Sequence, residues 1–320
     1  MKIVVLDKSA MGEDLSMSPL ERFGEVIIYN TTSAEEVKDR IADADVIVLN
    51  KVKITYEHMS YAKNLKLICI FATGYDNIDI KSAERRGIAV CNVPGYSTNS
   101  VVLFTLSNVL ALYSKLYEYN QFVKSGEYSA SGIPNKLTPV FHELHGKVWG
   151  VVGLGNIGRA VAKVAEAMGA RVIANKRTPD ESYECVDIEE LCRRSDIITL
   201  HCPLNDDTKN LINKDRINLM KREVIIVNEA RGAVVNEEDV KNAILSGRIA
   251  AYGSDVYSQE PFPKSHPFDS IKNESNVLLT PHAAWGAYES RVRCLDIICQ
   301  NIDAFIQDKS LNRVDKPKQN

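Results

Sequence analysis

The sequence predicts an α/β protein with two doubly wound parallel sheets, and three features of the chain lead to this fold class. Apolar runs of strand length alternate with helical segments over most of the 320 residues, as in sheets covered by helices on both faces. A glycine-rich turn joins a strand to a helix within Val148–Lys176. The length allows two domains of ordinary size.

The first hundred residues contain a complete set of alternating elements for one small α/β domain. Strands are expected at Lys2–Leu6, Glu25–Tyr29, Asp45–Leu49, Leu65–Ile70 and Ile88–Asn92. Helical segments are expected between them, at Pro19–Phe23, from the capping-box pattern at Ser33 to Ile41, at Thr55–Tyr61 and at Ile80–Arg86. This domain has no glycine fingerprint of its own.

A long mixed apolar pattern follows at residues 100–123, and it predicts one buried helix that leaves the first domain. The next segment, Ser125–Pro139, is polar and rich in glycine, serine and proline, which is typical of a surface loop.

The segment Val148–Lys176 predicts a dinucleotide-binding crossover. Gly153, Gly155 and Gly158 have the G-x-G-x-x-G spacing, in which the first glycine permits the turn, the second admits a pyrophosphate and the third lets helix and strand pack closely. The helix that starts there directs its free N–H groups at the phosphates, and a second strand follows at Arg171–Asn175. A glycine-rich turn without a ligand is the alternative interpretation.

The end of that second strand favours NADP(H) as the cofactor, with NAD(H) possible. An NAD site usually has an acidic residue here for the ribose hydroxyl, whereas this chain has Lys176 and Arg177. Two cations suit a 2′-phosphate, because ammonium and guanidinium groups form charge-assisted hydrogen bonds to phosphate oxygens. The alternative is that both residues serve only solubility at a strand end.

The remaining elements complete a second doubly wound sheet. After the fingerprint, the pattern predicts a helix from Asp187, a strand Asp196–Cys202, a helix Asn213–Met220, a strand Val224–Asn228, a helix Asn236–Leu245, a strand Ile249–Asp255, a loop Glu260–Pro267 and a strand Val277–Thr280.

A last helix, Ala287–Ile306, has no further strand to feed and is expected to return to the first domain. We therefore expect a discontinuous, flavodoxin-like substrate domain at 1–99 and 284–320. A Rossmann cofactor domain at 100–283 interrupts it, with a cleft between the two. The polar tail after Lys309 is expected to be loose.

Arg231, Glu260 and His282 all follow strands of the second sheet, at the edge where ligands of open α/β sheets bind. Hydride transfer to a 2-oxo acid needs a cation for the carboxylate, a proton donor for the new alkoxide and a group that supports the donor. Arg231, His282 and Glu260 can fill these roles in that order. Taken singly, a surface arginine, a loop glutamate and a structural histidine are equally good interpretations.

The composition excludes several other classes of function. A net charge of −3 gives no basic surplus for nucleic acid or an anionic membrane. The chain shows neither a signal-peptide pattern nor an apolar run of membrane-spanning length, so we expect a cytoplasmic protein. The seven cysteines are scattered without a Cys-x-x-Cys pair, and neither disulfides nor a metal site are expected.

Six motifs together resemble the D-isomer-specific 2-hydroxyacid dehydrogenase family, and most closely its glycerate dehydrogenase and hydroxypyruvate or glyoxylate reductase branch. They are FATGYDNIDI, GLGNIG, HCPLNDDTKNLIN, VNEARGAVVNEEDV, GSDVYSQEP and TPHAAW. The resemblance implies an oxidoreductase for a small 2-oxo or 2-hydroxy acid, with Arg231, Glu260 and His282 in the catalytic roles. It also implies a homodimer.

The same resemblance implies further site residues. The dinucleotide would be lined by Asn156, Ile157, Pro203, Thr208, Asn228, Glu229 and Ala230, with Asp255 at its nicotinamide end. The substrate would meet Lys51, the backbone of Thr73, Gly74 and Tyr75, and Trp285, which narrows the pocket.

The chain departs from the family pattern at one point near the chemistry. Glu229 stands where the family often has threonine, and it is expected to add a negative charge close to the site. Two alternatives remain open at this stage. One is the same chemistry on a bulkier 2-oxo acid, and the other is a nucleotide-sensing binding protein that resembles the family's corepressors. Formate or phosphite oxidation is not indicated by any motif.

Overall fold

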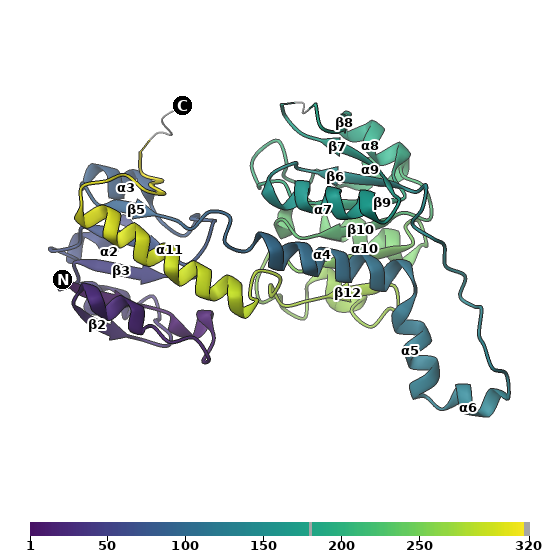
Figure 1. The fold of residues 1–320 in the computed structure, drawn as a ribbon, viewed down its shortest axis with the longest axis horizontal. Coiled ribbons are helices and arrows are strands. Elements are labelled where there is room, and N and C mark those ends of the chain that lie inside the picture. The colour runs from purple at the N-terminus through teal and green to yellow at the C-terminus, as the bar shows by residue number, and fades with distance from the viewer. Residues whose placement is uncertain (179–180, 317–320) are drawn as a thin grey trace. The chain divides into compact units, whose positions relative to one another are not determined.

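The structure is a computed structural model that describes residues 1–178 and 181–316 (Figure 1). The chain forms two compact units. Unit 1 comprises Met1–Ser97 and Gly286–Asn320, and unit 2 comprises Thr98–Trp285. Each unit contains one parallel sheet, with five strands in unit 1 and seven in unit 2, which confirms the predicted fold class.

The sheet of unit 1 has the order β2-β1-β3-β4-β5, and all its strand pairs are parallel. Its strands are β1 (Lys2–Val5), β2 (Glu25–Ile28), β3 (Val46–Leu49), β4 (Leu67–Ile70) and β5 (Ala89–Cys91). Short helices connect them: η1 (Lys8–Met11), η2 (Ser18–Phe23), α1 (Val37–Ile41), α2 (Tyr56–Tyr61) and α3 (Ile80–Arg85). Because β3 and β4 are buried along their whole length, they are continuous apolar runs without alternation.

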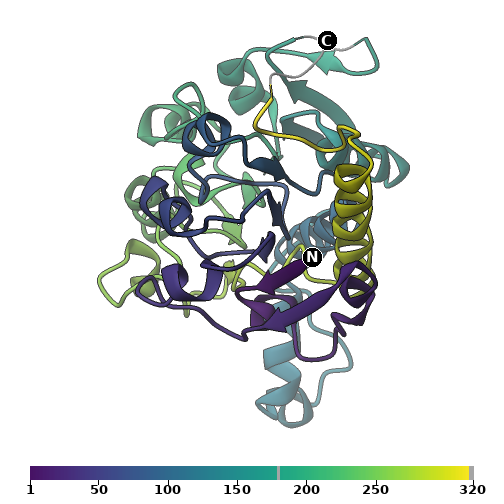
Figure 2. The ribbon, with the colours of Figure 1, turned by 90° about the vertical axis from the view of Figure 1, so that its left-hand side faces the viewer.

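The last helix, α11 (Tyr288–Ile306), belongs to unit 1, where it packs against β4 and η2 (Figure 2). The segment after it is ordered as far as it is described, so the expectation of a loose tail is wrong for residues 310–316. Val314 N donates to Val90 O at 2.9 Å, and the Asp315 carboxylate accepts from Val90 N at 2.9 Å. Pairing with the edge strand β5 orders a segment that has no periodic pattern; residues 317–320 lie outside the described residues.

The sheet of unit 2 has the order β12-β11-β10-β9-β6-β7-β8. Its strands are β6 (Val148–Val152), β7 (Arg171–Asn175), β8 (Glu184–Cys185), β9 (Ile197–Leu200), β10 (Ile225–Asn228), β11 (Ala251–Ser254) and β12 (Val277–Leu279). Its helices are α4 (Thr98–Tyr113), α5 (Leu116–Lys124), α6 (Glu127–Ser131), α7 (Asn156–Ala167), α8 (Ile188–Arg194), α9 (Lys214–Leu219), η3 (Gly232–Val234), α10 (Glu237–Leu245) and η4 (Pro267–Ser270).

Alternation along the central strands divides the core of unit 2 into two layers. Ile197 of β9 packs in the layer with residues of α4 and α7, whereas the next residue, Ile198, packs in the layer with residues of α8, α9 and α10. Successive side chains of a strand point to opposite faces, so both faces of the sheet are covered.

The sequence predicted one helix over residues 100–123, and the structure has two. The left-handed backbone of Lys115, at φ 56°, interrupts the helix between α4 and α5, which meet at an angle of 66°. Apolar content alone gave no sign of this break. The expected loop Ser125–Pro139 likewise contains the short helix α6, and the two-residue strand β8 was not predicted.

Among the residues that the structure describes, no single helix has the length and apolar character needed to cross a membrane; α4 and α5 reach them only when taken together as a bent pair.

Candidate active site

The glycine fingerprint has the geometry that its spacing predicts. Gly153 follows β6 with φ at 95°, a backbone conformation that disfavours other residues, and Gly155 caps α7. A Cβ atom on Gly158 would lie 2.0 Å from the carbonyl oxygen of Gly153, so only glycine fits there. A Cβ on Gly155 would meet nothing within 4 Å, which leaves open space in front of the helix N-terminus.

The parallel sheet brings the other predicted cofactor residues to the same edge, because the carboxyl ends of parallel strands lie together. Asn156 and Ile157 open α7, and Lys176 and Arg177 follow β7, the first half-buried and the second exposed. Pro203 and Thr208 follow β9, where the Thr208 hydroxyl donates to Pro203 O at 2.6 Å.

His282 and Glu260 form the clearest chemical pair at this edge. The Nδ1 atom of His282 lies 2.6 Å from Oε2 of Glu260, and the other carboxylate oxygen accepts from Tyr257 N at 3.0 Å. Both side chains remain partly accessible, at 27% and 30%. Since the contact uses Nδ1, Nε2 is the ring nitrogen that can exchange a proton with a ligand.

Arg231 lies beyond β10, at a turn that Asn228 organises. The Asn228 side chain accepts from Ala230 N and donates to Arg231 O, both at 3.0 Å. The Arg231 guanidinium is half-buried and donates to Ala230 O at 2.8 Å. The turn therefore fixes the backbone of Arg231 at the sheet edge that also carries His282 and Glu260.

Asp255 fastens the end of β11 to the turn that carries His282. It is 1% exposed and accepts three hydrogen bonds, from Thr280 Oγ1 at 2.6 Å and from Ala283 N and Ala284 N at 2.8 Å each. The resemblance implied only a contact with the nicotinamide end, so this positioning of the histidine turn is a role that the sequence did not reveal.

The surroundings of Glu229 contradict the expectation that this residue adds a negative charge close to the site. It is only 8% exposed, and burial together with the charge of Asp255 raises its pKa to about 8, against a lowering by the hydrogen bond from Asn108. The group is therefore mostly protonated at neutral pH and does not add the expected negative charge. A sequence shows a carboxyl group but not its loss of solvent, which decides its charge.

Glu237 is a further residue that sequence reasoning missed. Its carboxylate accepts from Ser258 N at 2.8 Å and from the Ser258 hydroxyl, and Nε2 of His266 lies 2.9 Å from its Oε2. Ser258 and His266 flank Glu260 in the chain, and the His266 ring stacks on Phe262. This buried cluster anchors both sides of the loop that presents Glu260. The motif Glu-Pro-Phe-Pro-Lys-Ser-His-Pro was visible, but nothing in it marked Glu237 as the partner.

The predicted substrate residues of unit 1 lie at the carboxyl edge of its own sheet. Lys51 follows β3, and Asp7 holds this turn by accepting from the backbone N–H groups of Asn50, Lys51 and Val52. Thr73 follows β4, and its hydroxyl donates to Val93 O at 2.8 Å. Gly74 and the 39%-exposed Tyr75 continue this turn, while Trp285 ends unit 2.

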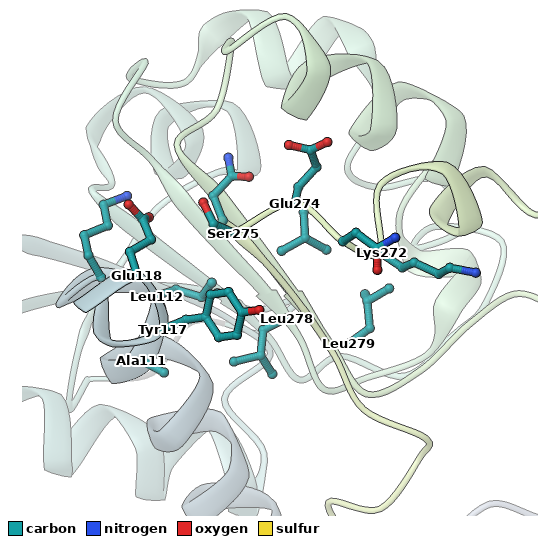
Figure 3. Close-up of a pocket in the computed structure, with 13 residues that line it drawn as sticks. Ala111, Leu112, Tyr117, Glu118, Lys272, Glu274, Ser275, Leu278 and Leu279 are labelled. Carbon is teal, nitrogen blue, oxygen red and sulfur yellow. The ribbon is translucent and has the colours of Figure 1, made fainter. Parts of the chain in front are cut away.

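A cavity of about 340 Å³ lies along the outer edge of β12, between that strand, the segment that leads into it and the junction of α4 with α5 (Figure 3). Its lining includes Tyr117, Glu118, Glu274 and Leu278, and none of the predicted site residues. We therefore do not assign it to the active site.

Comparison with known proteins decides the family. Residues 106–284 match the family described as D-isomer specific 2-hydroxyacid dehydrogenase, NAD binding domain. The chain belongs to this family. It is 38% identical to hydroxypyruvate reductase of Blautia hydrogenotrophica, over 99% of this chain and 100% of that protein. It is 33% identical to glycerate dehydrogenase of Methylorubrum extorquens, over 98% and 99%.

Solved structures agree with the sequence matches. D-lactate dehydrogenase from Aquifex aeolicus, complexed with NAD and lactic acid, has a TM-score of 0.86 at 27% identity and covers 99% of this chain and 100% of its own. An acyclic imino acid reductase in complex with NADPH and D-Arg has a TM-score of 0.85 at 28% identity, with coverages of 98% and 100%. The predicted family and enzyme class are confirmed: this 2-hydroxyacid dehydrogenase is an oxidoreductase that uses a nicotinamide cofactor.

The two glycines at the start of α7 offer a matched pair of substitutions. Gly158→Ala places a Cβ against a backbone oxygen and should destabilise unit 2 by roughly 1–3 kcal/mol. Gly155→Ala meets no protein atom, so it should leave the melting temperature unchanged while it weakens dinucleotide binding, because the methyl group occupies the space for the pyrophosphate. Thermal melts and cofactor titrations of both variants test this; equal effects on stability would contradict the assignment.

Proposed function

We propose that this dehydrogenase reduces a small 2-oxo acid, hydroxypyruvate or glyoxylate, with NADPH. The contact of His282 with Glu260 at the carboxyl edge of the unit 2 sheet carries the proposal, because it presents an oriented proton donor beside a dinucleotide cradle. The relatives named hydroxypyruvate reductase and glycerate dehydrogenase favour small substrates, and Trp285 would limit the size of the pocket.

The chain's own residues account for the reaction around the cofactor, which supplies the hydride when bound. Arg231 would hold the substrate carboxylate and polarise the carbonyl. As the carbonyl carbon accepts the hydride, His282 would give the proton on Nε2 to the carbonyl oxygen, which yields the 2-hydroxy acid and the oxidised cofactor. Glu260 would keep the ring oriented through its contact with Nδ1.

The residues of the fingerprint fit a dinucleotide, with Gly155, Asn156, Ile157 and Gly158 facing its pyrophosphate at the start of α7. We infer that Lys176 and Arg177 select NADPH by binding the 2′-phosphate. In unit 1, Lys51 and the backbone of Thr73, Gly74 and Tyr75 would serve the substrate. A cytoplasmic location suits an enzyme that draws on the intracellular pool of NADPH.

Initial rates of hydroxypyruvate and glyoxylate reduction, followed by loss of reduced-nicotinamide absorbance, test substrate and cofactor together. We expect turnover with NADPH preferred over NADH. Changing both Lys176 and Arg177 to Ala should raise the KM for NADPH about a hundredfold or more and leave that for NADH unchanged, since each lost charged hydrogen bond costs about 1.5–3 kcal/mol. Lys163→Ala, an exposed change on α7, is the control.

A preference of the unaltered enzyme for NADH would overturn the phosphate assignment and keep the enzyme. Turnover only with bulkier 2-oxo acids would overturn the substrate assignment. Without any turnover, the alternative of a nucleotide-sensing protein would replace the proposal.

If His282 is the general acid, its substitution should lower the rate of turnover and leave the affinity for the cofactor unchanged. His282→Gln should lower kcat by roughly 10²–10⁴, because general acid catalysis contributes this much, while NADPH still binds. Glu260→Gln should give a smaller loss because it removes only the support of the ring. The exposed change Glu166→Gln should have no effect. A rate that survives in His282→Gln would exclude this proton donor.

We also propose a homodimer that forms through α5, α6 and the segment after them. This arm has no buried residue in either helix and exposes large apolar side chains: Leu116, Tyr117, Val123, Tyr128, Ile133, Leu137, Val140 and Phe141. Such a concentration of exposed apolar residues is typical of a protein interface.

Light scattering after size exclusion should therefore give twice the chain mass at micromolar concentration. Changing Leu137 and Val140 to Glu should produce a monomer, because the charges would be buried without partners. The control Leu245→Glu alters another exposed leucine, on α10 and outside this arm, and should leave the dimer intact. A monomeric unaltered protein would contradict the proposal.

A further inference from the structure

Glu229 and Asp255 are the first residues after two neighbouring strands of unit 2, β10 and β11. Asn228 of β10 pairs with Ser254 of β11, so the next residue of each strand stands at the same level beyond the sheet edge. Asp255 N also donates to Asn228 O at 3.2 Å. Glu229 is 8% and Asp255 1% exposed, and two neighbouring buried carboxyl groups cannot both ionise cheaply.

The two carboxyl groups differ in their hydrogen bonds. Asp255 accepts three hydrogen bonds, from one hydroxyl and two backbone N–H groups. Glu229 accepts only one hydrogen bond, from Asn108 Nδ2 to Oε1 at 2.7 Å. Its Oε2 atom is buried and has no partner among the described residues. Burial, together with the neighbouring Asp255, raises the pKa of Glu229 and so favours a proton on this buried, poorly hydrogen-bonded carboxyl group.

The other elements around Glu229 provide little that would stabilise its ionised form. The helix α4 contributes Asn108 and has no acidic or basic residue along its length. After β9, burial lowers the pKa of His201 to about 3, so its ring is neutral. Burial raises the pKa of Tyr257, which keeps its phenol neutral. Arg231, two residues along the chain, directs its guanidinium to the backbone oxygen of Ala230.

We propose that Glu229 is a positioning residue whose proton keeps Asp255 in place to bind the nicotinamide end of the cofactor, and that loss of this proton weakens binding of the nicotinamide half. The inference rests on the proposed function. An ionised Glu229 would repel Asp255 and would draw water to the buried Oε2 atom of Glu229. Both effects would displace the ends of β10 and β11, which hold the turn of His282.

Cofactor affinity should fall as the pH rises, because the neutral form of Glu229 is the form that supports cofactor binding. Because the pKa of Glu229 is raised to about 8, the group is protonated below that pH and loses its proton as the pH rises through it. Cofactor affinity should be full at pH 6.5 to 7. It should fall roughly tenfold between pH 7 and 9, where the competent fraction becomes small.

The experiment compares two ligands across pH 6.5 to 9. NADPH is titrated by its nicotinamide fluorescence, and 2′-phospho-ADP-ribose, which lacks the nicotinamide, is titrated by calorimetry. We expect the affinity for NADPH to fall at high pH and the affinity for 2′-phospho-ADP-ribose to stay constant. Glu229→Gln keeps a neutral side chain of the same size and should bind NADPH equally well at both ends of the range. Glu166→Gln should keep the profile of the unaltered protein.

Asn108→Leu provides a second variant should Glu229→Gln fold poorly. The hydrogen bond from Asn108 lowers the pKa of Glu229, so its removal should move the loss of NADPH affinity to higher pH.

Equal pH profiles for NADPH in the unaltered protein and in Glu229→Gln would overturn the proposal. An equal loss of affinity for 2′-phospho-ADP-ribose at high pH would also overturn the proposal, since this loss would indicate a general opening of the site. Failure of the unaltered protein to bind NADPH at pH 6.5 would instead overturn the proposed function, and this inference with it.

Discussion

The carboxylate of Asp255 is the contact on which the candidate active site most depends. It joins the end of β11 to Thr280, Ala283 and Ala284, which surround His282 in the chain. His282 itself has a left-handed backbone with φ at 53°, a conformation that costs free energy for a residue other than glycine. Three hydrogen bonds to one buried carboxylate offset this cost and hold the imidazole at the sheet edge. The fixed backbone thereby keeps the His282 imidazole next to the Glu260 carboxylate.

The sequence could nominate the candidate residues of this site because the patterns that mark them are local. The spacing of Gly153 and Gly158 predicts a turn at the first and a close contact at the second. The structure explains both, through the positive φ of Gly153 and the short distance from Gly158 to the Gly153 carbonyl oxygen. The approach of Glu260 to His282 could be expected as soon as both were placed after strands of one parallel sheet. A parallel sheet follows from the alternation of strands and helices, and this alternation is visible along the chain.

The remaining features depend on contacts between distant segments, which no local pattern shows. The tail at residues 310–316 is polar, yet it is ordered by pairing with β5, more than 200 residues earlier in the chain. Lys115 interrupts an apolar run that is otherwise suited to one helix. Glu237 supports the Glu260 loop through Ser258 and His266, and neither partner is a neighbour in sequence. In each case the deciding partner is set by tertiary packing.

Glu229 and Glu260 show how one sheet edge gives two glutamates opposite properties. Glu260 is 30% accessible, and its carboxylate lies 2.6 Å from the imidazole of His282. Glu229 has lost its water and stands beside the buried charge of Asp255, so the neutral acid is favoured. Glu229 directly follows β10, whereas Glu260 lies farther along the loop after β11, so the two glutamates differ in position, in solvent exposure and in partner. The electrostatic character of the site is therefore a property of the folded unit, because the sheet register that aligns Glu229 with Asp255 also removes its charge.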